Sequence, residues 1–530
     1  MKIKKFLVII SVVVLSAVLG YRFGFSQSGN FLKSIVEPGS MVTEASYVIF
    51  TDGSTVYARN GNTGEIEFSG LDASNVIQST INQLTSGGKI FVRAGYYNLS
   101  APIVIDKNHN AIVIEGEGFS RAEDIGTRFK PPSNDYAFKV EGTSIAYPDC
   151  VHHVEFRNFG ISIPTADHTI SGSGIKLKYV HGSLLENIWM WNLKGYGLYI
   201  EQAAEGKFDQ VDMRYCGDAS SNASTLEIVG DGYTNHLMFT RLWIGQPYYY
   251  GLRVSAIYFM GSPQWISIIQ GYVHGSADQT VYGMTSNYPA VQLLGVDNFY
   301  MQDMYIGYFN ATLVNITDGV SQNFHVDISR CHFQLADSAI SSAATFGDIH
   351  DNYFLSLSKY AIITQRNQHD IHDNYFYYPY YNVNNTYSYI VLNSSYNLVK
   401  GNYFYDSGTI NQSKYSVEEL AGVDYNRIEG NNLYAGVTAK VVKVGGSTII
   451  KNNNGYVTEK NGIQAITSGS TIVTVNHGLD SSIDPTKIKI TVTPNWLTTF
   501  RVYGKTNNQF SVEFGTAAPS SAQIDWYAEV

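Results

Sequence analysis

The sequence predicts an all-β protein: a parallel β-helix that begins with an N-terminal cap helix and is followed by a small C-terminal antiparallel β-sandwich. Three observations support this prediction. Short β-branched and aromatic runs, separated by Asn, Asp and Gly, continue from Lys89 to about Gly455. Within that region a motif recurs with a period of about 22 residues, which is typical of stacked coils. After Gly462 the pattern changes to the alternation of half-buried antiparallel strands.

The composition provides material for a large apolar core. The 530 residues include 44% hydrophobic and only 15% charged side chains, so intrinsic disorder is excluded. The net charge is −10 and no basic run lies outside the N-terminus, so nucleic acid is not expected as a partner. Cys150, Cys216 and Cys331 are too few and too scattered for a disulfide framework or for paired metal-binding motifs. Stability must therefore come from packing.

Residues 1–27 are predicted to be a signal peptide or an uncleaved signal anchor. A basic start, Met1–Lys5, precedes an apolar run from Phe6 to Gly20, which is short for a membrane-spanning helix. No clean small-x-small cleavage site is present, so both alternatives stay open. In either case we expect an extracellular or cell-surface protein, with membrane anchoring if the segment is retained. Seven sequons agree with export and predict a glycoprotein, namely those at Asn98, Asn222, Asn310, Asn315, Asn384, Asn393 and Asn411.

Residues 28–71 are expected to form lead strands, and residues 72–460 the β-helix. The β-helix region opens with an amphipathic helix over residues 73–84. Asp72 is its expected N-cap, and Gly87 with Gly88 ends it. One face of this helix is apolar and should cover the open end of the coil stack, where strand edges would otherwise be unpaired; its residues are Val76, Ile77, Ile81 and Leu84.

An exact repeat identifies the coil. The heptapeptide Asp348–Phe354 recurs without change as Asp370–Phe376, 22 residues later. A coil of this length buries its inward face only by stacking on its neighbours. The predicted inward aliphatic positions are Met304, Ile328, Ile349, Ile371, Val399, Ile428 and Ile450. The predicted turn positions, where Asn tolerates left-handed backbone and can hydrogen-bond along the stack, are Gly307, Cys331, Asn352, Asn374, Asn402, Asn431 and Asn453.

A family resemblance agrees with this pattern. The helix from Asp72 to Leu84 and the following segment, Gly88–Ser100, resemble the N-terminal cap and first coil of the pectate-lyase-like right-handed β-helix superfamily. That group includes polysaccharide lyases, polygalacturonases, epimerases and viral tailspikes, so the resemblance implies a right-handed β-helix that is either an enzyme or a binding shaft. The polygalacturonase motifs Asn-Thr-Asp, Asp-Asp, Gly-His-Gly and Arg-Ile-Lys are absent, as is the pectate-lyase motif Trp-Ile-Asp-His. No catalytic residue is therefore carried over.

Residues 462–530 are predicted to be the C-terminal β-sandwich. Thr471–Leu479, Lys487–Thr493 and Gln509–Phe514 alternate between apolar and polar residues, as antiparallel strands with one buried face do. The Val-Asn-His-Gly-Leu hairpin and the terminal Trp-Tyr-Ala resemble small C-terminal modules of tail-fibre and surface proteins. The resemblance implies a binding or assembly role, with a homotrimer as one outcome.

The repeat also predicts a row of outward polar side chains. Asp303, Asp327, Asp348 and Asp370 stand one place before the inward aliphatic residue, and Tyr305, Ser329, His350 and His372 one place after it. Strand alternation directs both sets outward on the same face. Two carboxylates about 4.8 Å apart repel by about 3–4 kcal/mol at an effective dielectric of 20. A bound cation, a protonated His or a raised carboxylate pKa must offset this repulsion.

This row carries the expected site residues. Carboxylates bind hard cations and supply acid and base for glycoside cleavage, so Ca²⁺ is the expected cofactor; the alternative is a solvated face. Arg330 is expected either to clamp a sugar carboxylate or to pair with Asp351 or Asp327. The predicted catalytic residues are Asp327, Asp348, Asp370, His350, His372 and Arg330, and the predicted Ca²⁺ ligands are Asp303, Asp327, Asp348 and Asp370. Aromatic rings stack on sugars, and the predicted substrate-binding residues are Tyr305, Tyr377, Tyr378 and Tyr380.

Two further sets are weaker candidates. Asp209, Asp212, Arg214 and Asp218 form either a cleft site or a turn with ion pairs, and the pentads around His181 and His274 suggest one turn used twice. Two functions follow from the whole pattern. The first is an exported polysaccharide-active enzyme of lyase, hydrolase or epimerase type. The alternative is a non-catalytic, tailspike-like or cell-surface protein that binds a glycan.

Overall fold

The computed structural model describes residues 44–119, 125–163, 171–256, 262–275, 287–379, 385–406 and 412–530. The predicted signal segment 1–27, Tyr380 and two sequon residues, Asn384 and Asn411, lie outside these ranges. Within them, no helix has the length and apolar character that a membrane crossing requires. Cys150, Cys216 and Cys331 are buried free thiols.

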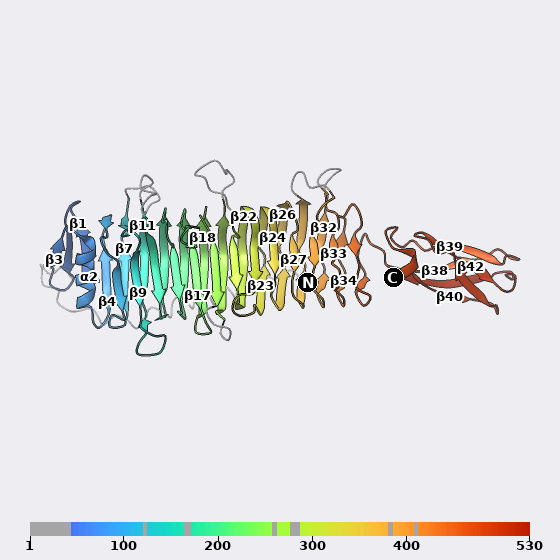
Figure 1. Ribbon diagram of the computed structural model, residues 1–530, viewed down its shortest axis with the longest axis horizontal. Coiled ribbons are helices and arrows are strands. Elements are labelled where there is room, and N and C mark those ends of the chain that lie inside the picture. The colour runs from blue at the N-terminus through green and yellow to red at the C-terminus, as the bar shows by residue number, and fades with distance from the viewer. Residues whose placement is uncertain are drawn as a thin grey trace, which may run out of the picture.

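The described chain begins with three antiparallel strands and the predicted cap helix. These elements are β1 (Tyr47–Thr51), β2 (Val56–Asn60), β3 (Ile66–Gly70) and α2 (Ala73–Gln83). The carboxylate of Asp72 accepts a hydrogen bond from the Ser74 amide, as an N-cap does. The predicted apolar face, Val76, Ile77, Ile81 and Leu84, is buried and α2 lies across the open end of the stack (Figure 1). The cap prediction is confirmed.

Three columns of parallel strands form the β-helix, and we call them faces A, B and C in chain order within a coil. Face A consists of β4 (Gly88–Val92), β7 (Ile112–Gly116), the first parts of β11 (Glu155–Ser162), β14 (Leu184–Trp191), β16 (Lys207–Arg214), β18 (Asn235–Gly245), β20 (Gln264–His274) and β22 (Asp297–Thr317), and then β23 (His325–Ser329), β25 (Phe346–His350), β28 (His369–His372), β31 (Leu398–Lys400), β34 (Arg427–Glu429) and β37 (Ile449–Lys451).

Face B follows face A in each coil. It consists of β5 (Gly95–Asn98), β8 (Thr127–Lys130), the later parts of β11, β14, β16, β18 and β20, the middle of β22, the start of β24 (His332–Ser342), β26 (Tyr353–Leu357), β29 (Tyr375–Pro379), β32 (Tyr403–Tyr405) and β35 (Asn432–Leu433).

Face C closes the coil. It consists of β6 (Ile103–Asp106), β9 (Tyr136–Glu141), β12 (Ser173–Lys178), β15 (Leu198–Glu201), β17 (Leu226–Gly230), β19 (Leu252–Ala256), β21 (Val291–Leu294), the ends of β22 and β24, β27 (Ile362–Thr364), β30 (Ile390–Leu392), β33 (Val417–Glu419) and β36 (Val441–Val442). A separate short pair joins β10 (Val151–His152) to β13 (Val180–His181).

Faces A and B meet at a tight corner. In each repeat a single residue with a φ near +55° makes the bend; among these corner residues are Arg241 (+53°), Asp303 (+55°), Arg330 (+52°), Asp351 (+55°) and Asp373 (+54°). The residue after the corner points into the core. From the middle of the stack onward it is Asn, and each amide Nδ2 donates to the next Oδ1 at 2.9–3.1 Å along Asn352, Asn374, Asn402, Asn431 and Asn453. This Asn ladder confirms the predicted column from Asn352 onward and its hydrogen bonds along the stack. The expected left-handed backbone at the Asn is wrong, because the positive φ lies one residue earlier, as at Asp351 and Asp373.

Inside the stack, residues of the same type occupy equivalent positions in successive coils. Ile328, Ile349, Ile371, Val399, Ile428 and Ile450 share one register, as predicted. The adjoining column on face B stacks Phe333, Phe354, Phe376 and Phe404 with ring centroids 5.1, 4.8 and 4.6 Å apart. Stacked aromatic pairs contribute about 0.5–1.5 kcal/mol each beyond the burial of their area.

The predicted repeat register is wrong before residue 325. Met301 pairs with Ile328, and Gly307 pairs with Gln334, so Met304 is not the inward aliphatic residue and Gly307 is not the turn residue. The prediction aligned Tyr308-Phe309 with the Phe endings of the later repeats, and this alignment is shifted by three residues from the observed register. The physical reason is that β22 runs unbroken over 21 residues through its corner with no Asn to mark it.

The C-terminal module consists of two three-stranded antiparallel sheets. One contains β38 (Glu459–Ala465), β43 (Gln523–Glu529) and β40 (Lys489–Pro494), and the other β39 (Ile472–Asn476), β42 (Gln509–Phe514) and β41 (Phe500–Tyr503). A 3₁₀ turn, η2, spans Pro485–Lys487. Figure 1 shows this module beyond the last coil, at the opposite end from α2. The all-β fold class is therefore as predicted.

Candidate functional site

An Asp/His row runs along face A. Asp327, Asp348 and Asp370 are register partners in successive coils, and so are Ser329, His350 and His372. The intervening Ile328, Ile349 and Ile371 are buried, which directs both columns outward. The structure thus brings together five of the predicted catalytic residues.

Asp303 does not belong to this row, which corrects the predicted Ca²⁺ ligand set. It is a corner residue in the register of Arg330, and Arg330 holds it in a bidentate ion pair, with Nε 2.8 Å from Oδ1 and Nη2 2.9 Å from Oδ2. Arg330 therefore pairs with neither Asp351 nor Asp327. This guanidinium lowers the pKa of Asp303.

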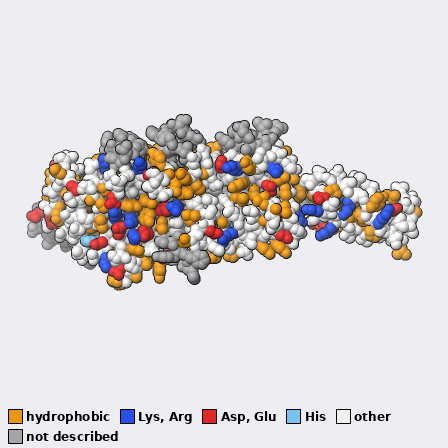
Figure 2. Space-filling view, viewed as in Figure 1, with side chains coloured by type: hydrophobic (Ala, Val, Ile, Leu, Met, Phe, Trp, Pro, Cys, Tyr) orange, Lys and Arg blue, Asp and Glu red, His pale blue; other side chains and the backbone are white. Residues whose placement is uncertain are grey.

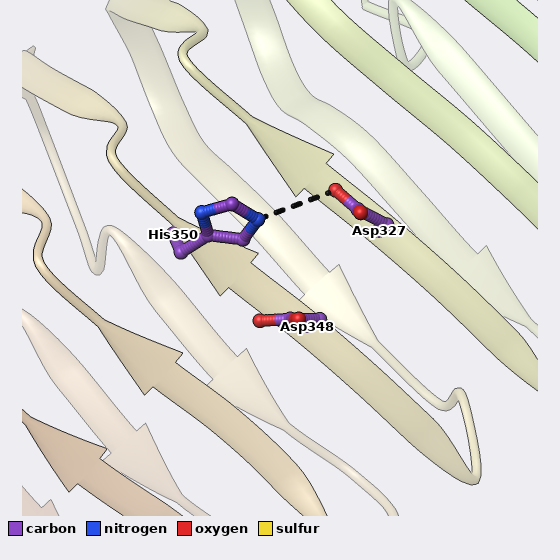
Figure 3. A group of neighbouring side chains, drawn as sticks. All are labelled: Asp327, Asp348 and His350. Carbon is purple, nitrogen blue, oxygen red and sulfur yellow. Dashed lines mark ion pairs between the residues drawn. The ribbon is translucent and has the colours of Figure 1, made fainter.

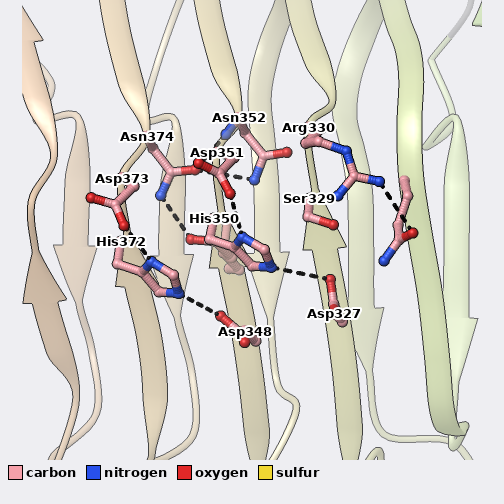
Figure 4. A network of polar contacts seen from close by, with 12 residues as sticks. Asp327, Ser329, Arg330, Asp348, His350, Asp351, Asn352, His372, Asp373 and Asn374 are labelled. Atoms are coloured by element: carbon pink, nitrogen blue, oxygen red, sulfur yellow. Dashed lines mark hydrogen bonds and ion pairs between the residues drawn. The ribbon is translucent and has the colours of Figure 1, made fainter. Parts of the chain in front are cut away.

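Each His of the row lies between two carboxylates. The Nδ1 atom of His350 is 2.8 Å from Asp351 Oδ2, and its Nε2 is 3.6 Å from Asp327 Oδ1 (Figure 3). His372 repeats the arrangement one coil later, 2.9 Å from Asp373 and 3.2 Å from Asp348 (Figure 4). The two imidazole rings stack with centroids 4.8 Å apart and an interplanar angle of 3°.

These contacts relieve the repulsion expected along the row. Burial, together with the nearby Asp348, raises the pKa of Asp370. Burial lowers the pKa of His372, but its hydrogen bond with Asp373 and the neighbouring carboxylates outweigh burial, so the pKa is raised overall. Both shifts act against the repulsion, because a raised pKa of Asp370 favours its neutral form and a raised pKa of His372 favours the positively charged imidazole.

A groove of about 530 Å³ lies beside the corner on face B. Its charged lining residues are the corner residues Arg241, Asp303 and Arg330. Its aromatic wall consists of Trp243, Tyr272, Tyr305 and His332, of which Trp243, Tyr305 and His332 each stand two places after one of these corner residues. Tyr305 therefore lies here and not in the His column, because it pairs with His332. Two predicted residues, Tyr305 and Arg330, meet in this groove.

The aromatic wall is part of a longer aromatic column on face B. Register partners follow one another as Trp243, Tyr272, Tyr305, His332, Tyr353, Tyr375 and Tyr403. Successive ring centroids are 4.7, 5.4, 5.3, 4.9, 5.2 and 4.8 Å apart. Sequence reasoning missed this column, although a Tyr directly after each ladder Asn at Asn352, Asn374 and Asn402 was a usable signal.

The other predicted aromatic residues are only partly described. Tyr377 lies on face B, where its ring stacks on Tyr405 at 5.4 Å. Tyr378 belongs to β29 and its side chain is not described, and Tyr380 lies outside the described ranges.

The structure does not bring the residues of the two weaker candidate sets together into a common site. Asp209 on face A pairs with Arg241, and Asp212 on face B pairs with Arg214, so the predicted acidic cluster forms distinct ion pairs. Asp218 caps its own turn through Ser220. The repeated pentads do not share a turn, because His181 lies in the short β13 and His274 ends β20 on face B. Figure 2 shows acidic and basic side chains next to one another in small groups, separated by hydrophobic and uncharged surface.

Face C holds a buried ion pair that sequence reasoning missed. Glu227 is only 3% exposed, and burial raises its pKa to about 7. Ser224 Oγ donates to its carboxylate at 2.6 Å, and Arg253 Nη1 lies 3.4 Å away. A single Glu within the apolar run Leu226–Gly230 was the available signal.

Comparisons with known proteins find structural similarity alone. No protein-family model matches the chain, and no curated protein matches it. The Pseudomonas phage phi297 tailspike gp61 superposes with a TM-score of 0.54 at 10% identity, covering 86% of this chain and 92% of the tailspike. The Azotobacter vinelandii mannuronan C-5 epimerase AlgE4 A-module gives 0.41 at 14% identity, over 72% and 96%.

Geobacillus virus E2 ORF18 gives a TM-score of 0.45 at 16% identity over 67% of this chain, which spans 58% of that protein's length. Identities this low carry information on fold only. The tailspike superposition extends over most of both chains, and the coil stack described above provides the independent structural evidence. The chain therefore has the right-handed parallel β-helix fold.

Proposed function

We propose that the protein acts on a polysaccharide that it binds along the face B groove. The observation that carries this proposal is that the aromatic wall of Trp243, Tyr272, Tyr305 and His332 and the charged corner residues line the same groove. Sugar rings have apolar faces that stack on aromatic side chains and polar edges that need hydrogen-bond partners. A groove lined by aromatic and by charged side chains can bind both the apolar faces and the polar edges of a sugar.

The direction of the aromatic column supports a polymeric ligand. Its rings repeat once per coil, parallel to the long axis, and continue beyond the groove to Tyr353, Tyr375 and Tyr403. A monosaccharide would need only one or two of these rings. A linear glycan that lies along the axis can meet a new ring at each coil.

The charge of the groove suits a neutral or uronic glycan. Arg241 and Arg330 are about half exposed, and each is already paired with an Asp, Arg241 with Asp209 and Arg330 with Asp303. Guanidinium groups bind carboxylates in a bidentate manner. We therefore assign Arg330 as the clamp for a sugar carboxylate, which would compete with Asp303.

The catalytic part of the proposal rests on the Asp/His row. Asp370, with its raised pKa, is suited to donate a proton, and Asp327, Asp348, His350 and His372 supply further acid and base groups. Lyase, hydrolase and epimerase chemistry all use such groups. The alternative is a non-catalytic protein that binds glycan in the groove and uses the β-helix as a rigid shaft, as the tailspike fold allows.

The proposal includes export and assembly. The basic and apolar N-terminal segment 1–27 supports an extracellular or cell-surface location, with membrane anchoring if it is retained. Homotrimerisation is the assembly we propose for a shaft of this shape. Size-exclusion chromatography with light scattering of the exported protein tests it, and a monomer at micromolar concentration would contradict it.

A two-step experiment tests the function. The full chain is screened against immobilised glycans for binding and against the same glycans for new reducing ends or unsaturated-sugar absorbance. Trp243→Ala should weaken binding of any hit at least ten-fold, about 1.4 kcal/mol. Trp265→Ala is the matched control, because Trp265 is an exposed Trp that does not line the groove.

Asp370→Asn separates the two functions. It should leave binding unchanged and abolish turnover if the protein is an enzyme. Binding without product from any glycan would favour the non-catalytic alternative. Equal binding by wild type and Trp243→Ala would contradict the groove assignment.

A further inference from the structure

Several buried acceptor atoms of the Asp/His row have no hydrogen-bond donor among the described residues. These atoms are Oδ1 of Asp327, Oδ1 of Asp348 and Oδ1 of Asp370. The first two atoms lie near imidazole nitrogens: Asp327 Oδ1 is 3.6 Å from His350 Nε2, and Asp348 Oδ1 is 3.2 Å from His372 Nε2. Buried acceptors without a donor are uncommon in native proteins and call for an explanation.

The contact at His350 is not a hydrogen bond. A separation of 3.6 Å between Nε2 and Asp327 Oδ1 exceeds the usual donor–acceptor range. On the other side of the ring, Nδ1 lies 2.8 Å from the Asp351 carboxylate, which can only accept, so Nδ1 carries the proton. In the neutral ring Nε2 then presents a lone pair toward the lone pairs of Asp327.

Ser329 provides an independent observation. It is fully buried, and its Oγ has no hydrogen-bond partner among the described residues. Ser329 precedes His350 in the same outward column. Figure 4 shows Ser329 beside Asp327 on one strand, next to the strand that carries His350. Among the described residues, the Ser329 hydroxyl and the carboxylate oxygens of Asp327 and Asp348 thus have buried oxygen atoms without hydrogen-bond partners near the His350 imidazole, and oxygen and imidazole nitrogen atoms are the ligands that divalent cations take.

We propose that Asp327, Asp348 and His350, assisted by Ser329, bind one divalent metal ion. One ligand atom from each of the first three residues lies within 4.8 Å of the other two, so a single ion between them can reach all three (Figure 3). Asp351, hydrogen-bonded to Nδ1, is the outer carboxylate that orients a metal-binding His. This site does not depend on glycan binding.

The ligand set predicts which metal is preferred. Two carboxylates and one imidazole suit Zn²⁺ or Mn²⁺, whereas Ca²⁺ takes oxygen ligands almost alone. We expect Zn²⁺ to bind most tightly and Ca²⁺ to bind with lower affinity. The remaining coordination positions would face solvent, because Asp348 is 39% exposed.

Isothermal titration calorimetry of the full chain with ZnCl₂, MnCl₂ and CaCl₂ tests the proposal. One high-affinity Zn²⁺ per chain is expected, with a raised melting temperature. Asp348→Asn and His350→Gln should each reduce Zn²⁺ affinity more than 100-fold. Asp351→Asn should reduce it by about 10–100-fold, as loss of an outer carboxylate does.

Asp373→Asn is the matched control. Asp373 has the same position on His372 that Asp351 has on His350, but it does not touch a proposed ligand of the site, so affinity should be unchanged. Co²⁺ substitution should add a visible absorption band that is lost in His350→Gln. The proposal is overturned if Zn²⁺ does not bind, if Asp348→Asn and His350→Gln bind it as wild type does, or if Ca²⁺ binds more tightly than Zn²⁺.

Discussion

At the residue scale, Asn374 shows how one side chain joins neighbouring coils. Its Oδ1 accepts from the amide N and from Nδ2 of Asn352, at 3.0 and 3.1 Å. Its own Nδ2 donates to Asn402 Oδ1 at 3.0 Å and to the Ile349 carbonyl at 2.7 Å. The side chain is 1% exposed, so water cannot replace these partners.

Replacing Asn374 with Ala should therefore destabilise the protein by about 3 kcal/mol. The change leaves a buried amide of Asn352 without an acceptor and a buried Asn402 oxygen without one donor, and such losses cost about 1–3 kcal/mol each. Urea denaturation monitored by circular dichroism measures the effect. Asn62→Ala, at an exposed Asn outside the ladder and outside the sequons, is the control. A loss below 1 kcal/mol for Asn374→Ala would show that the ladder is not a source of stability.

Glu227 should make the folding stability of the protein depend on pH, and the direction of this dependence follows from its raised pKa. Burial raises the pKa of its carboxyl group in the folded state to about 7 from the usual 4.5. Between these values the folded state binds more protons than the unfolded state, so stability falls as pH rises through this window. The folded protein should be more stable at pH 5 than at pH 8 through this group, by up to about 3 kcal/mol.

Glu227→Gln should remove this contribution. Denaturation midpoints of wild type and variant, compared at pH 5 and pH 8, measure the difference between their slopes. Other groups titrate in both proteins, so the comparison isolates Glu227. Identical slopes would mean that the carboxylate is already ionised at pH 5 in the folded state.

Residue-scale prediction from sequence depended on the heptapeptide repeat. Asp327, Asp348, Asp370, His350 and His372 could be placed together because the repeat supplies their register. Asp303 and Tyr305 could not, because the chain around them has no repeat and no turn Asn. The proton position on His350 and the unpartnered Ser329 hydroxyl depend on contacts between coils, which a sequence does not contain.

At the element scale, α2 closes one end of the stack. It contacts β2, β3, β5 and β6, and its apolar face covers the first coils. Without this cover, the unpaired edge of the first coil would be free to pair with another chain.

Ile81→Asp should cause aggregation or loss of soluble protein. Ile81 is fully buried, and a charge there would displace α2 from the stack. Light scattering and the soluble fraction after expression are the measurements. Asn82→Asp, on the exposed side of the same helix turn, should behave as wild type. A soluble, monomeric Ile81→Asp protein would show that α2 is dispensable.

Strand β22 explains where element-scale prediction failed. Its 21 residues pass through all three faces, and no Asn or Gly stands at the corner between faces A and B. The aromatic-Phe ending at Tyr308-Phe309 was therefore the strongest local signal, and it gave the wrong register. The coils after residue 325 carry a buried Asn at each corner, and there the predicted inward aliphatic and turn columns are correct.

At the scale of the whole molecule, both ends of the stack are covered by different structures. The C-terminal module lies against the last coils, where Val441, Ile450 and Tyr456 line a cavity of about 430 Å³ together with Ile483 of the module. These four side chains are buried. The module is therefore a second cap as well as a separate sandwich.

Removal of residues 462–530 should expose this end. The truncated chain is expected to melt at lower temperature and to self-associate, because Val441 and Ile450 would then face solvent beside an unpaired edge of β37. Differential scanning calorimetry and analytical ultracentrifugation measure both effects. An unchanged melting temperature in a monomeric truncated chain would contradict a capping role.

The identical heptapeptides have a consequence for how this protein can change length. Gly347 and His369 are register partners, so excision of residues 348–369 would join equivalent points of adjacent coils. Asp370 and His372 would then take the places of Asp348 and His350 beside Asp327, and the Phe and Asn columns would close up without a shift. The shaft can thus be shortened or, by duplication, lengthened in units of one coil, and each product would inherit an intact copy of the Asp/His arrangement.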